Sequence, residues 1–138
     1  MKKVTIILIF SAFSFFVFSQ GTNVYSVFVN YVNEDFKFPL IGFVNIAKGD
    51  HQGLQLGFFN TNTGNYSGLQ TGFVNTTGGS FNGVQLSFLN TAIGDAEGWQ
   101  LGFVNTATKE TRGAQIGFVN TTIRGMDGLQ LGFVNVAK

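Results

Sequence analysis

The sequence predicts an all-β protein, specifically a parallel β-solenoid built from fifteen-residue coils. The first observation is an octapeptide, Gly-x-Gln-x-Gly-Phe-x-Asn, which recurs every fifteen residues without insertion or deletion. The second is the alternation of apolar with small or polar residues in each copy, which is typical of a strand. The third is glycine at two framework positions per copy, which disfavours a helix. So strict a period indicates a repeat architecture, in which each unit is stable only when stacked on its neighbours.

Six copies of the octapeptide and two decayed copies share one phase. The six copies occupy residues 53–60, 68–75, 83–90, 98–105, 113–120 and 128–135. Ser87 replaces the second glycine in one of them, and residues 41–45 and 28–30 keep the phase upstream. The chain therefore divides into residues 1–19, a degenerate segment 20–40 that we expect to cap the repeats, and a repeat domain 41–138.

Each fifteen-residue unit is expected to form two strands and two bends, which together make one coil. Coils that pair in parallel are about 4.8 Å apart, so seven to eight of them give a rod of roughly 35 Å. We place the bends at Asn60 and Gly68, with a short second strand between them whose Thr61 and Tyr66 columns face inward. The alternatives are an antiparallel meander or a small outer-membrane β-barrel, because each unit also offers an alternating strand of about ten residues.

Equivalent residues of successive coils would lie directly above one another, and this predicts three ladders. The phenylalanines would stack, and the amides would bond to their neighbours along the axis. We expect Leu54, Leu56 and Phe58 to face inward, because burial of a large apolar side chain gains roughly 1.5–3 kcal/mol. The predicted ladder residues are Gln55, Gln70, Gln85, Gln100, Gln115 and Gln130; Asn45, Asn60, Asn75, Asn90, Asn105, Asn120 and Asn135; and Phe58, Phe73, Phe88, Phe103, Phe118 and Phe133.

The first nineteen residues have the layout of a secretory signal peptide. A basic start, Met1-Lys2-Lys3, precedes an apolar run, and Val17 and Ser19 suit the −3 and −1 positions of a cleavage site before Gln20. The apolar run is short for a membrane span, although an uncleaved anchor is the alternative. Removal of Lys2 and Lys3 would leave six basic residues (8 − 2) against seven acidic ones, a net charge of −1, with no basic field for nucleic acid.

The sequence offers no catalytic, cofactor or metal site. The chain has one histidine, His51, and no cysteine, which does not support a triad or a zinc site. We interpret His51 as a structural imidazole, and the glycines as unrelated to phosphate binding because no helix follows them. The chain is therefore predicted to be non-enzymatic, with any specific function in the segments where the repeat varies, 95–99, 109–112 and 124–127.

Two resemblances bear on function. The run Gln100-Leu101-Gly102-Phe103-Val104-Asn105-Thr106-Ala107 resembles the Gln-x-Gly-x-x-Asn-x-Ala signature of curlin repeats, which are extracellular amyloid subunits of bacteria. That resemblance implies two strands per coil with the Gln and Gly side facing inward, opposite to the burial argument, and the curlin unit is longer. The wording Gly-Leu-Gln-Leu-Gly-Phe-Val-Asn, over 41–138, is similar to bacterial exported short-repeat surface proteins, which implies location more than activity.

We expect an exported surface repeat protein with a structural, adhesive or self-assembly role. The repeats run to the last residues without a visible cap, so self-association through the last coil is predicted. Its surface or matrix partner is not indicated by the sequence, and nucleic acid is not expected. The alternatives are an outer-membrane β-barrel, a curlin-like fibre subunit, and ice binding by the threonine column, where Thr-x-Thr pairs occur at Thr61/Thr63 and Thr106/Thr108.

Overall fold

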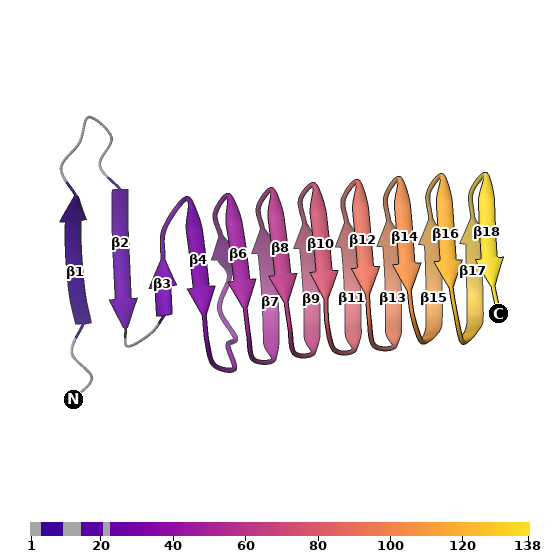
Figure 1. Cartoon of the computed structure of the whole chain (residues 1–138), viewed down its shortest axis with the longest axis horizontal. Helices are drawn as coiled ribbons and strands as arrows, with labels where there is room; N and C mark the ends of the chain where they lie inside the picture. Colours follow the sequence, from indigo (N-terminus) through magenta and orange to yellow (C-terminus); the bar gives the residue numbers. More distant parts are fainter. Residues whose placement is uncertain (1–3, 10–14, 21–22) are drawn as a thin grey trace.

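The computed structural model describes residues 4–9, 15–20 and 23–138, which form strands joined by bends (Figure 1). The strands are β1 (Val4–Ile9), β2 (Phe15–Gln20), β3 (Asn23–Tyr25), β4 (Val29–Val32), β5 (Leu40–Ile41), β6 (Val44–Ala47), β7 (His51–Leu56), β8 (Phe59–Asn62), β9 (Tyr66–Thr71), β10 (Val74–Thr77), β11 (Phe81–Leu86), β12 (Leu89–Ala92), β13 (Ala96–Leu101), β14 (Val104–Ala107), β15 (Glu110–Ile116), β16 (Val119–Thr122), β17 (Gly125–Leu131) and β18 (Val134–Ala137). Each repeat contributes one long and one short strand. The long strands and β5 form a seven-stranded sheet, and the short ones belong to an eleven-stranded sheet.

The repeats pair in parallel and in register, so each residue lies beside its equivalent fifteen positions later. Gln85 pairs with Gln100 in the long-strand sheet, and Asn90 pairs with Asn105 in the short-strand sheet. This pairing confirms the predicted β-solenoid. The antiparallel meander and the small barrel both require antiparallel neighbours, so those alternatives are wrong for the repeats. Figure 1 shows the coils stacked along one axis, and from β6 onward they have nearly the same shape.

The bends lie elsewhere in the unit than predicted. They fall at Gly57–Phe58 and at residues 63–65, whereas Asn60 lies inside β8 and Gly68 inside β9. Gly68 is required by close stacking: its φ is 141°, and a Cβ there would lie 1.9 Å from the carbonyl oxygen of Gly53. Gly57 is a true bend residue, and a Cβ there would lie 2.2 Å from the carbonyl oxygen of Gly42. The glycines thus set the coil-to-coil distance as well as the turn.

The predicted inward face of the long strand is also wrong. Gln55 is fully buried, whereas Leu54 is half-buried and Leu56 and Phe58 are exposed. In the short strand, Asn60 is buried and Thr61 points outward. The physical reason is that a narrow coil places the amides of the glutamine column, and those of the asparagine column, next to identical amides of the neighbouring coils. The cost of burying the amides is removed by hydrogen bonds, while the large apolar side chains pack along the outside.

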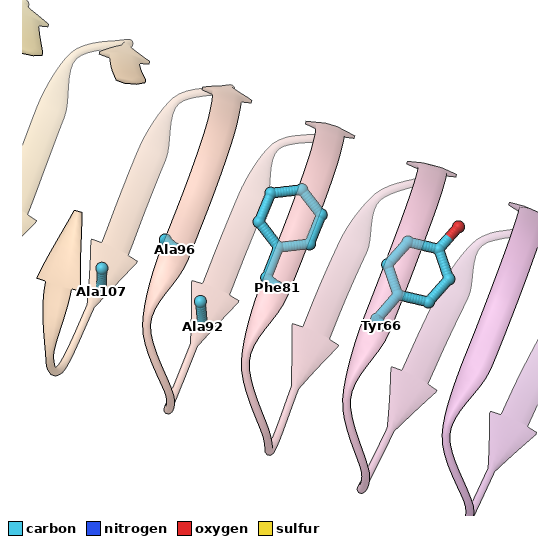
Figure 2. Close-up of a cluster of buried hydrophobic side chains, with 5 residues drawn as sticks. All are labelled: Tyr66, Phe81, Ala92, Ala96 and Ala107. Atoms are coloured by element: carbon cyan, nitrogen blue, oxygen red, sulfur yellow. The ribbon is translucent and has the colours of Figure 1, made fainter. Parts of the chain in front are cut away.

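The apolar core is small and lies between the two sheets. Tyr66 and Phe81 stack with ring centroids 6.1 Å apart, and alanines fill the coils that follow. Figure 2 shows this cluster, with Ala96 continuing the column of the two rings. A second cluster, of Val32, Leu40 and Ala47, lies toward the N-terminal end. The predicted inward position of the Tyr66 column is confirmed, although Tyr66 begins the long strand.

The segment that precedes the repeats is only partly regular. Its β4 already pairs in parallel with β6, and Phe36 makes an isolated parallel bridge to His51. Upstream, β1, β2, β3 and β4 pair antiparallel and extend the short-strand sheet. Of the predicted signal peptide, residues 1–3 and 10–14 lie outside the described residues, and the expected cleavage site after Ser19 falls within β2.

Candidate functional site

The asparagine ladder runs through the whole repeat domain, as predicted. Each Nδ2 donates to the Oδ1 of the next asparagine at 2.7–3.1 Å, from Asn45 to Asn135. The same Nδ2 groups also donate to a carbonyl of the following coil, for example Asn90 to Leu101 at 2.8 Å. Ser87, where the framework glycine is lost, donates to the ladder through its hydroxyl at Asn90 Oδ1, 2.7 Å away. These amides are therefore occupied in holding the coils together.

A second ladder is formed by the glutamines of the long strands. Gln85 Nε2 donates to Gln70 Oε1 at 2.7 Å, and Gln100 Nε2 donates to Gln85 Oε1 at 2.8 Å, and the pattern continues to Gln130. The ladder begins at Gln55 because the preceding coil has Leu40 in this column. Gln55 Nε2 is accordingly a buried donor without a partner.

The phenylalanine column forms one continuous stack on the outside, at the bend between the two sheets. We call it the aromatic ridge: Phe43, Phe58, Phe73, Phe88, Phe103, Phe118 and Phe133. Successive rings have centroids 4.9–5.1 Å apart and planes within 7° of parallel. The Leu56 column, with exposed residues such as Leu56 and Leu86, flanks the ridge on one side, and the Phe59 column, most of which is half-buried, flanks it on the other.

The opposite bend carries the charge. Every charged residue of the repeat domain falls at a position equivalent to 63, 64, 65 or 67, so we call this side the charged edge. Asp50 Oδ1 accepts the backbone N–H of Asn65 at 2.7 Å, and Asn65 Oδ1 accepts that of Ser80 at 2.8 Å. Arg112 pairs with Glu97 at 3.1 Å and with Glu110 at 3.2 Å. The carboxylates and amides here fasten one bend to the next.

A groove of about 590 Å³ follows the charged edge from Asp35 to Glu97. His51 is part of its lining but is itself buried, and its Nε2 lies 2.9 Å from the carbonyl oxygen of Phe38. That contact makes Nε2 the protonated nitrogen in the neutral ring, and Nδ1 has no hydrogen-bond partner. Burial lowers the pKa of His51, and it raises the pKa of Tyr66, whose hydroxyl donates to Gly53. Both groups are therefore held neutral inside the coil.

The described residues do not assemble a recognisable reactive centre. No group of three or more metal-ligating side chains occurs among them, and their carboxylates lie along the charged edge. Nor does any helix long and apolar enough to cross a bilayer occur in the part of the chain that the structure covers. The variable segments 95–99, 109–112 and 124–127 lie on successive coils at or beside the charged edge, so the structure brings them together.

Sequence reasoning missed the exposed apolar band beside the ridge. Its signal was present, because the alternation that buries Gln55 and Asn60 must turn Leu56 and Phe59 outward. The resemblance to curlin repeats implied the observed arrangement, whereas the burial argument implied the reverse.

Comparisons of the chain with protein-family models, with curated proteins and with solved structures find no match.

Proposed function

We propose that this chain is an exported, non-enzymatic structural protein that acts by presenting a regular β-surface for assembly at the cell surface. The observation that supports it is the repetition of the outer face. Identical rings recur every 4.9–5.1 Å along the rod, so the rod offers one group many times in one direction. Such a surface suits multivalent packing or adhesion better than recognition of one small molecule.

A second line of support is that the polar side chains of the repeat framework hold the coils together. The glutamines and asparagines that recur in the repeat form their side-chain hydrogen bonds with neighbouring coils. The carboxylates Asp35 and Asp50 accept backbone N–H groups of the next bend. The ladder amides therefore have few hydrogen-bonding groups left for a substrate.

Self-association through β17 and β18 belongs to the same proposal. These strands lie at the ends of the two sheets and pair on one side only within the described residues. Both carry the residues that pair throughout the rod, among them Gln130 and Asn135. A strand of a second molecule that adds there would find the same ladder that each coil offers to the next.

Two measurements on the full chain test the proposal. Protease treatment of intact cells that produce it should degrade the chain while a cytoplasmic marker survives, because the basic and apolar N-terminal residues are expected to direct export. Sedimentation velocity of the purified chain should show species larger than a monomer at tens of micromolar. A protease-resistant chain in intact cells would contradict export, and a strictly monomeric chain would contradict assembly.

A further inference from the structure

We propose that the aromatic ridge is a lateral interface at which two copies of this chain pack side by side along the rod. The inference rests on the proposed assembly function and names its partner and its surface. It differs from growth at β17 and β18, because the ridge runs along the coils and leaves their ends free.

The ridge is large and its rings are half exposed. From Phe43 to Phe118 the six residues are 39–53% exposed, which at about 200 Å² for a whole aromatic side chain leaves about 550 Å² of ring surface in water. Ile41, Leu56, Leu86 and Leu131 beside the ridge are 42–58% exposed and add to that area. The largest apolar patch of an ordinary monomer is about 300–600 Å², and a stable interface uses about 800 Å² of each partner. The ridge and its flanking columns are of the size that a dimer needs.

The distribution of charge favours a second copy over a lipid surface. The columns of Leu56, Phe58 and Phe59 contain no charged residue between positions 41 and 134, and Thr71 is the one polar exception. Interfacial membrane segments rely on lysine and arginine beside the apolar face. In this rod the basic residues Lys109, Arg112 and Arg124 lie at the charged edge, on the far side of the coil.

The period of the ridge favours the same partner. A second copy carries rings at the same 4.9–5.1 Å spacing, so every ring meets an equivalent neighbour along the full contact. The contact is reciprocal, with the aromatic ridge of each copy lying against the aromatic ridge of the other, which is the isologous arrangement of most homodimers.

Cysteine cross-linking tests the pairing, because the chain contains no natural cysteine. Phe88 is the middle ring of the seven. In two rods that overlap along their full length, Phe88→Cys of one copy therefore lies opposite Phe88→Cys of the other, whether the rods are parallel or antiparallel. Ile93→Cys is the matched control, since Ile93 lies in the same coil at the charged edge and is 50% exposed against 48% for Phe88. Mild oxidation of the full chain should give a disulfide-linked dimer from Phe88→Cys and at least about tenfold less from Ile93→Cys. Equal yields from the two variants would overturn the inference.

A second pair of variants measures the strength of the contact. Phe73→Lys with Phe103→Lys places charge on the ridge, while Ile93→Lys with Ile123→Lys places the same charge on the opposite edge. We expect the ridge variant to raise the dimer dissociation constant at least about 100-fold and the control to change it less than about threefold, with both keeping the β-sheet circular dichroism.

The outcomes separate the ridge from the proposed function. If the chain forms assemblies but Phe88→Cys gives no disulfide-linked dimer, the ridge is not the interface, while the proposed assembly function still stands. A parent chain that is monomeric at all concentrations would contradict both. A monomer that co-sediments with phosphatidylcholine vesicles, and loses that binding in the ridge variant, would overturn the pairing of copies in favour of lipid.

Discussion

Removal of one buried rung should show how much the asparagine ladder stabilises the rod, and Asn90→Ala is the sharpest perturbation. Asn90 is fully buried and makes four hydrogen bonds through its side chain. Its Oδ1 accepts from Asn75 at 3.1 Å and from Ser87 at 2.7 Å, and its Nδ2 donates to Leu101 at 2.8 Å and to Asn105 at 2.9 Å.

The expected cost follows from what each partner loses. Asn75 and Ser87 keep other acceptors, so their two bonds are worth about 0.5–1 kcal/mol each. Leu101 keeps the backbone N–H of Ser87, but Asn105 Oδ1 becomes a buried acceptor without a donor, which costs about 1–3 kcal/mol. The total is about 2–5 kcal/mol, a large share of the stability of a small domain.

The repeat supplies its own control in the same column. Asn135→Ala removes an exposed rung, which accepts from Asn120 and donates to Gly132 at 3.0 Å, and water can replace both contacts. We expect its cost to be about 0.5–1.5 kcal/mol. Urea unfolding of the full chain, followed by Trp99 fluorescence and circular dichroism, measures both values, provided that the two transitions coincide. If Asn90→Ala costs no more than Asn135→Ala, the buried ladder is not a main source of stability.

Three further predictions, which use four substitutions, test separate parts of the fold. Gly98→Ala should lower the free energy of unfolding in urea by more than about 3 kcal/mol, because Gly98 has a φ of 117° and a Cβ there would lie 2.1 Å from the carbonyl oxygen of Gly83. Gly125→Ala is the control. A Cβ at Gly125 would have its nearest neighbouring atom 3.8 Å away, so this change should stay within about 0.5 kcal/mol. Arg112→Ala should cost less than about 1 kcal/mol, because its ion pairs with Glu97 and Glu110 are exposed; a larger loss would mean that the charged edge is more than a solvated face. Burial lowers the pKa of His51 below 6.5, so the unfolded chain takes up this proton first and the melting temperature of the parent should fall as the pH drops below about 6.5. His51→Phe should reduce that loss between about pH 7.5 and pH 5, and an unchanged pH dependence would show that other groups cause it.

Much of this fold could be predicted from the spacing of identical residues. A fifteen-residue period without insertions requires stacked coils, and stacking requires that Gln85 meets Gln100 and Asn90 meets Asn105. The parallel register and the amide ladders follow from that requirement alone. The position of the bends did not follow, because Asn and Gly suit turns and also suit buried ladders and close backbone contacts.

The inward face could not be read from hydrophobicity. Alternation with period two defines two faces of a strand and does not say which of them is inside. Column variation carries the missing information: the Leu54 column accepts both Trp99 and Ala114, while the buried glutamine and asparagine columns are uniform over the six octapeptide copies. A position whose hydrogen bonds need an identical partner cannot vary, whereas an exposed one can. For the amide columns, uniformity is therefore a better guide to the inside of this solenoid than apolar character, whereas the buried Tyr66 column varies from His51 to Ala96.

The aromatic ridge is uniform as well, although it lies outside, and this exception sharpens the interpretation. Stacking at 4.9–5.1 Å explains why one ring favours another above and below, since each buries part of its surface against its neighbours. It does not explain why the surface that remains in water is aromatic, because Thr71 and Leu101 show that the adjoining column accepts residues of quite different polarity. Contacts within a single rod therefore explain the aromatic character of only the part of each ring that its neighbours cover. A second rod packed along the ridge would cover the rest and explain why that surface is aromatic too.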